Sequence, residues 1–285
     1  MTDAVDTGAG TAVSSGPALE MKDVAFSYPD AGSTALAAVD LDCGAGEVVG
    51  IIGPNGAGKT TLLKLAAGLI QPSGGRVRVL GRDPARGPRK ETARRVAYVP
   101  VALKAEFPMT VRDLVNLGRI PHISGFFESA DDRRVVTRAL GLVDSIHLAD
   151  RLFPSISAGE QKRVLVARAL AQEPRLLLLD EPSANLDIAH GVALLDCIAG
   201  LAATRGLAVL AAIHDLNLAL LFCDRLVMVK EGRVVASGDP ESVMLYPVVR
   251  EVFGSDVYIG RNELSGKLFV VPLRERGSKA PQNHL

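Results

Sequence analysis

Residues 48–64, VVGIIGPNGAGKTTLLK, limit the folds open to this chain more than any other stretch. An apolar run leads into a glycine-rich loop, which is followed by a segment with apolar residues at helical spacing. Gly53, Gly58, Lys59 and Thr60 match the pattern G-x-x-x-x-G-K-[ST]. Because the pattern lies between a predicted strand and a predicted helix, it indicates a phosphate-binding loop. The alternative is a glycine turn with an incidental lysine.

The residue types in this loop suit a nucleoside triphosphate. Glycines let backbone N–H groups close on phosphate oxygens, and the start of the following helix adds a partial positive charge. Lys59 supplies a point charge for the β and γ phosphates, and the Thr60 hydroxyl can ligate Mg²⁺. The predicted nucleotide-binding residues of the loop are Gly53, Pro54, Asn55, Gly56, Ala57, Gly58, Lys59, Thr60 and Thr61.

A second stretch, RLLLLDEP (175–182), supplies acidic groups that complement the loop. Its four leucines predict a buried strand, and Asp180 and Glu181 follow at the carboxyl end, where ligands bind in parallel sheets. Asp180 can hold Mg²⁺ through its water shell, and Glu181 can orient and deprotonate the attacking water. The alternative is a strand that ends in two solvated acids.

The segment AAIHDLN (211–217) repeats this arrangement at the end of the next predicted strand. A lone histidine is more often structural, but His214 occupies a position from which it can hydrogen-bond a γ-phosphate. We therefore predict that Glu181 and His214 are catalytic and that Thr60 and Asp180 are the metal ligands.

Helical and strand patterns alternate in the second half of the chain. Predicted helices at 159–172, 189–205 and 216–223 are each followed by an apolar strand: RLLLLD, LAVLAAIHD and RLVMVKEG. Strands that are apolar on both faces and alternate with helices indicate an α/β fold with a buried, mainly parallel sheet.

The first half of the chain is less regular. RVRVLG (76–81) and RVAYVP (95–100) are interpreted as a strand pair. Thr110 is predicted to cap a short helix, and Ser129 and Asp132 have the spacing of a capping box before another. Short helices are therefore expected between residues 109 and 152.

The stretch SISAGEQKR (155–163) separates this chain from other proteins with a phosphate-binding loop. Ser157 and Glu160 have capping-box spacing, so Ser157 is predicted to begin a helix whose free N–H groups face outward. One interpretation is an ordinary helix start. The other is a second anion site, formed by the helix N-terminus and the serine hydroxyl.

Together these motifs resemble the nucleotide-binding subunits of ABC transporters, whose signature is LSGGQ. The resemblance runs from about Leu19 to at least Gly238, and the phosphate loop, signature, RLLLLDEP, SANLD and histidine occur in family order. It implies a P-loop NTPase (RecA-like) core with a mainly parallel sheet, an antiparallel β subdomain and an inserted α-helical subdomain. The predicted divisions are a disordered lead (1–18), the nucleotide-binding core with its β subdomain (19–100 and 157–238), the helical subdomain (101–156), a C-terminal extension (239–276) and a flexible tail (277–285).

In that family two cassettes pair head-to-tail, and ATP lies between the phosphate loop of one chain and the signature helix of the other. By this resemblance Asp187, which closes SANLD, lies across the dimer seam. Tyr28, in FSYPD, matches the aromatic residue that stacks on adenine, although alone it would be interpreted as a strand aromatic that covers the core. The residues that the resemblance assigns to the partner's nucleotide are Ser157, Ala158, Gly159 and Glu160.

Two positions depart from the family pattern. A glutamine normally follows the strand that matches VAYVP and helps to place water and Mg²⁺, but here the position is Val101, and no glutamine occurs between Gln71 and Gln161. We hypothesise that hydrolysis is slowed, or that a neighbouring polar residue such as Glu106 substitutes. Ala158 replaces the first glycine of the signature, which adds a methyl group near the phosphate.

Three further segments, LDIAHGVALL, IHDLNLAL and YPVVREVFGSDVYI, look like those of importers of ferric siderophores, cobalamin and haem. The resemblance implies an ATPase with ATP and Mg²⁺ as cofactors, at the cytoplasmic face of the membrane. Its implied partners are a second copy, two integral membrane permease subunits and an extracytoplasmic substrate-binding protein. The alternatives are a zinc/manganese-type importer, an exporter, a hydrolysis-impaired regulatory subunit and a soluble ABC ATPase.

The charge and the hydropathy of the chain argue against a nucleic-acid-binding protein and against a membrane-spanning protein. The 32 basic and 32 acidic residues cancel, so we expect no nucleic-acid partner. One local exception, RDPARGPRKETARR (82–95), carries six basic residues against two acidic ones and is interpreted as a solvated loop and strand edge. No uninterrupted apolar run reaches the roughly 18–20 residues of a membrane span, so any membrane role is expected to require a partner.

Overall fold

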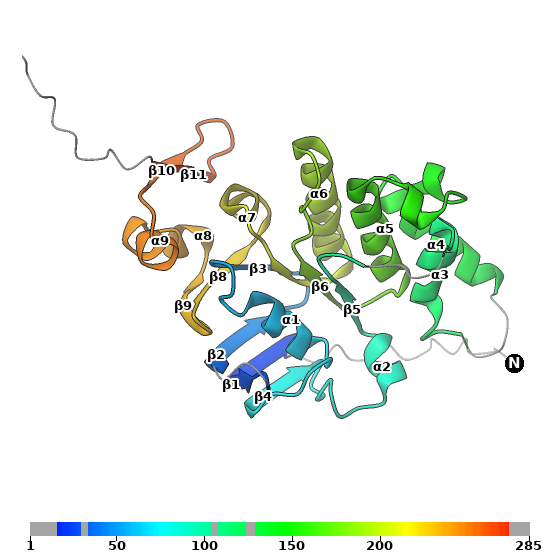
Figure 1. Cartoon of the computed structure of the whole chain (residues 1–285), viewed down its shortest axis with the longest axis horizontal. Coiled ribbons are helices and arrows are strands. Elements are labelled where there is room, and N and C mark those ends of the chain that lie inside the picture. Colours follow the sequence, from blue (N-terminus) through cyan, green and yellow to red (C-terminus); the bar gives the residue numbers. More distant parts are fainter. Residues whose placement is uncertain (1–15, 30–33, 104–107, 124–128, 274–285) are drawn as a thin grey trace, which may run out of the picture.

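The computed structural model describes residues 16–29, 34–103, 108–123 and 129–273. Its centre is a six-stranded sheet in the order β5-β6-β7-β3-β8-β9 (Figure 1). The first five strands run parallel, and β9 pairs antiparallel with β8 at one edge, so the predicted α/β fold with a mainly parallel sheet is confirmed. The strand bounds are β3 Val48–Ile52, β5 Val96–Val99, β6 Leu176–Asp180, β7 Ala208–Ala212, β8 Arg225–Lys230 and β9 Arg233–Gly238.

Helices cover both faces of this sheet, which is why its central strands are fully buried. Successive side chains of β6 alternate between the faces. Leu176 and Leu178 belong to the core that includes α1, and Leu177 and Leu179 belong to the core on the other face. The covering helices are α1 Lys59–Ala66 on the first face, and α5 Ala158–Ala171, α6 Ile188–Arg205 and α7 Leu216–Phe222 on the second (Figure 1).

A three-stranded antiparallel sheet in the order β2-β1-β4 lies on the α1 side. Its strands are β1 Leu19–Ser27, β2 Thr34–Cys43 and β4 Gly74–Val79. The predicted pairing of residues 76–81 with 95–100 is wrong, because β4 pairs with β1 and β5 pairs with β6. The burial patterns give the physical reason. β4 alternates exposed arginines with buried valines, as a half-exposed antiparallel strand does, whereas β5 is buried almost throughout and suits the parallel sheet.

Short helices beside α5 form the next part of the chain. The predicted cap at Thr110 is present and forms a capping box with Asp113, and the predicted capping box of Ser129 and Asp132 is present as well. These helices are α3 Val111–Asn116, η1 Leu117–Arg119, α4 Ala130–Leu142, η2 Ile146–Leu148 and η3 Phe153–Ser155, with α2 Arg89–Ala93 preceding β5. The predicted boundaries between subdomains remain predictions.

The C-terminal part contains two short helices and a hairpin. Both sides of the Asn217 amide hold the hairpin against α7, because Nδ2 donates to the Val270 carbonyl at 3.2 Å and Oδ1 accepts from the Val270 N–H at 2.8 Å. The elements are α8 Pro240–Val243, α9 Tyr246–Phe253, β10 Val257–Arg261 and β11 Leu268–Pro272.

Among the residues that the structure describes, one helix, α6, is long and apolar enough to span a membrane by length and composition alone, with 18 residues and a mean hydropathy of 1.3. Its Leu194, Ile198 and Leu201 side chains are buried in the core against the parallel sheet. Packing in this core accounts for the 33% of the helix that is buried.

Candidate functional site

The predicted phosphate-loop residues, Asp180, Glu181 and His214 gather where the carboxyl ends of β6, β7 and β3 lie side by side. Asp180 ends β6, His214 follows β7, and the glycine-rich loop follows β3 and leads into α1. This is the edge of a parallel sheet at which ligands bind.

The glycine-rich loop passes so close to neighbouring strands that two of its glycines exclude any side chain. Gly53 has a φ of 150°, and a Cβ there would lie 2.0 Å from the Val229 carbonyl oxygen in β8. Gly58 has a φ of 105°, and a Cβ there would lie 2.7 Å from the Leu36 side chain in β2. Only glycine tolerates this path, which presents backbone N–H groups at the start of α1.

Lys59 folds back over this loop. Its ammonium donates to the carbonyls of Gly53 at 2.8 Å and Pro54 at 2.9 Å. Burial lowers the pKa of Lys59, and the nearby carboxylates of Glu181 and Asp180 act in the opposite direction. The ammonium therefore lies between the loop carbonyls and the acids. There it can exchange its hydrogen bonds with the carbonyls for hydrogen bonds to an anion bound in the loop.

The Asp180 carboxylate joins the loop to the parallel sheet. It is 2% exposed and accepts hydrogen bonds from Thr60 Oγ1 at 3.1 Å and from the Tyr98 hydroxyl at 3.1 Å. Burial and the neighbouring Asp180 raise the pKa of Tyr98, so its hydroxyl remains a donor. Tyr98 was not predicted as a site residue. Its position near the end of a strand of the parallel sheet could have indicated that it lies close to the site.

Thr60 and Asp180 offer the oxygen donors that Mg²⁺ prefers. In the described ranges, no group of three or more His, Cys, Asp or Glu side chains is placed to hold a metal ion. A Mg²⁺ bound with a nucleotide keeps several of its waters and takes one or two protein ligands together with phosphate oxygens. The pair of donors fits that requirement.

Glu181 and His214 approach each other from neighbouring strands. Glu181 Oε1 lies 3.7 Å from His214 Nε2, and their side chains are 26% and 51% exposed. Glu181 has a φ of 49°, in the left-handed region, and its N–H donates to the Ala212 carbonyl of β7 at 3.0 Å. This uncommon backbone conformation is held by the neighbouring strand, as is frequent at functional sites.

A buried lysine that was not predicted lies behind these acids. Lys162, on α5, is 3% exposed, and its ammonium donates to the carbonyls of Asp180 at 2.9 Å, Pro100 at 3.1 Å and Val101 at 3.3 Å. Burial lowers the pKa of Lys162 to about 8, while Asp180 and Glu181 oppose that shift. In the sequence, Lys162 cannot be distinguished from an ordinary polar residue on a helix. Its contacts become evident only from the packing of α5 against the strand ends.

Val101 occupies the position at which the resemblance predicts a glutamine. Its side chain is 40% exposed, and its carbonyl accepts from Lys162. The backbone after β5 is therefore tied to α5, while the side chain faces outward. Glu106, the hypothesised substitute, lies outside the described residues.

Ser157 begins α5 through the predicted capping box. Its hydroxyl accepts from the Glu160 N–H at 3.3 Å and donates to Glu160 Oε2 at 2.8 Å, and the same oxygen accepts from the Ser157 N–H at 2.8 Å. Ser157 and Ala158 are exposed. In the described part of the chain, no hydrogen bond joins these residues to the glycine-rich loop of the same chain. The helix start is thus a separate exposed surface.

Tyr28 and Asp187 have contacts within the chain. The Tyr28 ring packs edge-on against Phe26, with centroids 4.8 Å apart, and its hydroxyl lies 3.2 Å from Thr61 Oγ1. Tyr28 is 36% exposed, so part of the ring beside the loop remains open. Asp187 caps α6, where it accepts from the His190 N–H at 2.8 Å and lies 2.7 Å from His190 Nδ1. These hydrogen bonds lower the pKa of Asp187.

Comparisons with known proteins agree with this geometry. Residues 36–184 match the family model described as ABC transporter. The cobalamin import ATP-binding protein BtuD of Halobacterium salinarum is 43% identical over 250 residues, which cover 88% of this chain and 63% of that relative's length. The hemin import ATP-binding protein HmuV of Gloeobacter violaceus is 39% identical over 262 residues, which cover 90% of this chain and 94% of that relative.

Solved structures show the same fold. A chain of a transporter assigned to the metal-chelate type, in an inward-facing conformation, is 26% identical with a TM-score of 0.79, covering 91% of this chain and 99% of that one. A dimeric ATP-binding cassette in a post-hydrolysis state with ADP and Pi is 27% identical with a TM-score of 0.71, covering 78% of this chain and 98% of that one. The fold of this chain is therefore that of an ABC ATP-binding cassette.

Proposed function

This chain belongs to the ABC transporter family, and we propose that it is the ATP-binding and ATP-hydrolysing subunit of an importer for a tetrapyrrole or ferric chelate. The cargo classes are a ferric siderophore, cobalamin or haem. The observation that carries the ATPase assignment is the contact of Thr60 Oγ1 with the Asp180 carboxylate at 3.1 Å, because it joins the phosphate loop to the acidic strand end.

Each part of the site has a role in this proposal. The loop N–H groups and Lys59 bind the phosphates, and Thr60 and Asp180 hold Mg²⁺, which neutralises phosphate charge and orients the nucleotide. Glu181 orients and deprotonates the attacking water, and His214 hydrogen-bonds the γ-phosphate from the neighbouring strand. The distance of 3.7 Å between Glu181 Oε1 and His214 Nε2 supports these separate roles. The two side chains lie close together at the strand ends, but they do not hydrogen-bond each other.

The exposed start of α5 supports a head-to-tail dimer. Its free N–H groups, together with the Ser157 hydroxyl once that leaves Glu160 Oε2, can bind an anion that the chain's own loop does not hold. We place it against the γ-phosphate bound to a second copy, with Asp187 at the seam and Tyr28 stacked on adenine. ABC import ATPases work as dimers with membrane permeases, which place the ATPase at the cytoplasmic side of the membrane. Two permease subunits and an extracytoplasmic binding protein complete the proposed importer.

The choice of cargo rests on the relatives named for cobalamin and hemin import and on the metal-chelate type of the structural neighbour. Since the halobacterial relative extends beyond the matched region, its cargo transfers to this chain only as a proposal. Zinc/manganese import and export are the competing assignments. Proteoliposomes with the cognate permease and binding protein separate them: cobalamin, haem or a ferric siderophore should raise ATP turnover, and stimulation by Zn²⁺ or Mn²⁺ alone would overturn the proposal.

The Glu181→Gln variant tests the catalytic assignment itself. Turnover should fall by about 10²–10⁴-fold while ATP affinity remains, because the water loses its base. The variant should accumulate as an ATP-bound dimer in light scattering. Retained turnover, or a monomer in the presence of ATP, Mg²⁺ and the permease subunits, would contradict the proposal.

A second candidate follows from Val101, whose apolar side chain stands where the family carries glutamine. In that case the chain is a regulatory subunit that closes on ATP but hydrolyses it poorly. The retained Glu181 and His214 argue against this candidate. The turnover of the purified wild-type dimer, measured with its permease, discriminates between the two.

A further inference from the structure

A cavity of about 950 Å³ lies at the end of the parallel sheet opposite the glycine-rich loop. Arg95 and Arg175 immediately precede β5 and β6, and Leu207 immediately precedes β7, so all three belong to the amino ends of these strands. The predicted nucleotide site lies at the carboxyl ends of the same sheet. The two sites are therefore separate.

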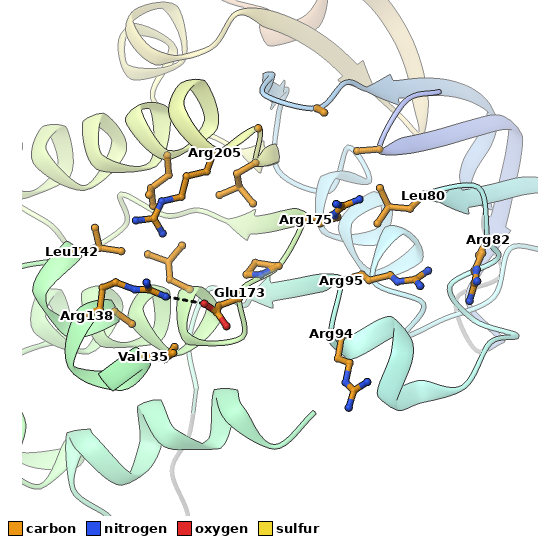
Figure 2. Close-up of a pocket in the computed structure, with 18 of the residues that line it drawn as sticks. Leu80, Arg82, Arg94, Arg95, Val135, Arg138, Leu142, Glu173, Arg175 and Arg205 are labelled. Carbon is orange, nitrogen blue, oxygen red and sulfur yellow. Dashed lines mark hydrogen bonds and ion pairs between the residues drawn. The ribbon is translucent and has the colours of Figure 1, made fainter. Parts of the chain in front are cut away.

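Four parts of the fold contribute walls to this cavity. Leu80 follows β4, Val135 and Leu142 belong to α4, and Leu170 and Leu201 come from α5 and α6. Figure 2 shows the α4 and α6 side chains on one side and Leu80 on the other. The cavity thus lies where the antiparallel sheet, the short helices and the parallel sheet meet. Its volume is in the range of small-molecule sites.

The charged side chains around the cavity are almost all arginines, in a chain with zero net charge. The only acid among the lining residues, Glu173, already pairs with Arg119 at 2.9 Å and with Arg138 at 2.7 Å. The arginines that line the cavity are Arg82, Arg94, Arg95, Arg138, Arg175 and Arg205.

Four of these guanidinium groups, those of Arg94, Arg95, Arg175 and Arg205, form no ion pair within the described ranges, and all but Arg94 also lack a side-chain hydrogen bond there. Arg82 pairs with Glu91 at 2.7 Å, and Arg94 donates to the Pro121 carbonyl. For Arg95, Arg175 and Arg205, no ion pair and no side-chain hydrogen bond to another described residue is present. In Figure 2, Arg95 and Arg175 lie near Leu80, and Arg205 lies on the opposite wall with Arg138. This arrangement brings positive charge to the cavity from two sides.

Like charges that line one cavity repel each other, although Arg175 and Arg205 are exposed and Arg95 is half-buried, so that water screens part of this repulsion. An anion bound between the arginines on the two sides of the cavity would attract both groups and so replace this repulsion with attraction. The planar guanidinium group is suited to this role, because it donates two parallel hydrogen bonds to a phosphate or carboxylate group. Three of these arginines, Arg82, Arg94 and Arg95, come from the basic stretch at residues 82–95. No residue of that stretch belongs to the predicted nucleotide site.

We propose that this arginine cavity binds a small soluble polyanion with at least two phosphate or carboxylate groups. One group contacts Arg95 and Arg175, and the other contacts Arg205. The bound molecule bridges α6 and the amino ends of β5 and β6. A concave site of this size favours a small molecule over a nucleic acid, which needs an extended basic surface.

The test is isothermal titration calorimetry of the full chain with inorganic tripolyphosphate and, separately, with citrate. Saturating ADP occupies the glycine-rich loop in every titration. The test variant is Arg95→Gln/Arg175→Gln. The control is Arg133→Gln/Arg233→Gln, which removes the same charge from two exposed arginines that do not line the cavity. Thermal unfolding of both variants confirms that they fold.

Wild type and control should bind at least one of the probes with equal affinity, and the test variant should bind it at least about tenfold more weakly. Equal weakening in both variants would overturn the proposal, because it would indicate general charge attraction. Absence of binding of both probes to wild type would also overturn it. A flotation arm uses phosphatidylserine vesicles. Vesicle binding that the test variant loses, without binding of either probe, would assign the arginines to a membrane surface instead.

Discussion

The buried ammonium of Lys162 donates a 2.9 Å hydrogen bond to the backbone carbonyl of Asp180, the residue whose carboxylate accepts from Thr60. The same ammonium bonds the carbonyls of Pro100 and Val101. One side chain from α5 therefore holds together the end of β6, the end of β5 and the segment that follows β5. Ser157 caps the start of the same helix. Lys162 therefore also connects the exposed start of α5 with the end of β6 at Asp180.

Replacing Lys162 with methionine should lower the free energy of unfolding by about 1–3 kcal/mol, because buried carbonyls lose their donor. ATP turnover should fall as well, since Asp180 and the segment after β5 are no longer tied together. Urea unfolding and steady-state ATPase assays measure the two effects. Lys90→Met is the matched control, because Lys90 is exposed and donates to the single carbonyl of Ile123. Unfolding and turnover both unchanged in Lys162→Met would contradict this role.

Ser157→Ala should separate helix capping from dimer formation. Loss of the cap should cost about 0.5–2 kcal/mol of stability, and the proposed contact with the partner's γ-phosphate should also be lost. Ser129→Ala removes an equivalent capping box from α4 and controls for the first effect alone. Analytical ultracentrifugation with ATP, in the Glu181→Gln background, should show a dimer for Ser129→Ala and a monomer for Ser157→Ala. The same outcome for both variants would show that Ser157 acts only as a cap.

Val101→Gln should raise basal and permease-stimulated ATP turnover, because an amide regains the ability to orient water and Mg²⁺. Its stability should stay within about 0.5 kcal/mol of wild type, since the side chain is 40% exposed. Val235→Gln, at a position that is 36% exposed on β9, controls for added surface polarity. If turnover does not change in either measurement, the missing glutamine has no consequence in this protein.

The buried pair of Arg119 and Asp132 predicts how stability depends on pH. Hydrogen bonds from Ser129 and then from Arg119 lower the pKa of Asp132 to about 2, below the value of about 3.9 expected in the unfolded chain. A lowered pKa in the folded state stabilises the protein above pH 4, and this stabilisation is lost as the pH falls from about 4 to 2.

Asp132→Asn should therefore flatten the decline of unfolding free energy between pH 4 and pH 2. Asp131→Asn, at an exposed neighbour, should leave the decline unchanged. Arg119→Met should cost about 3–5 kcal/mol at neutral pH, since it leaves the carboxylate buried without its cationic partner. Urea unfolding at several pH values measures these differences. A decline in Asp132→Asn as steep as in wild type would refute the assignment to this pair.

Local spacing explains why part of the site could be predicted. The capping boxes at Ser129 and Ser157 and the cap at Thr110 could be predicted, because a cap and its partner lie three residues apart in the chain. The glycine-rich loop and the acids after four leucines were readable for the same reason, since each motif is a short segment with its own geometry. Residues 76–81 and 95–100 were wrongly paired with each other, because strand partners are chosen by burial across the whole sheet.

The amino-acid sequence alone determined the phosphate-binding loop and the helices and strands that alternate between residues 158 and 230, because those preferences act between residues close together in the chain. Only the tertiary structure placed Tyr98 and Lys162 at Asp180, gathered arginines from distant segments around one cavity, and turned the Val101 side chain outward. These relationships depend on contacts between residues far apart in sequence. Such contacts form when apolar faces are buried together, and no local pattern records which polar groups that burial brings into reach.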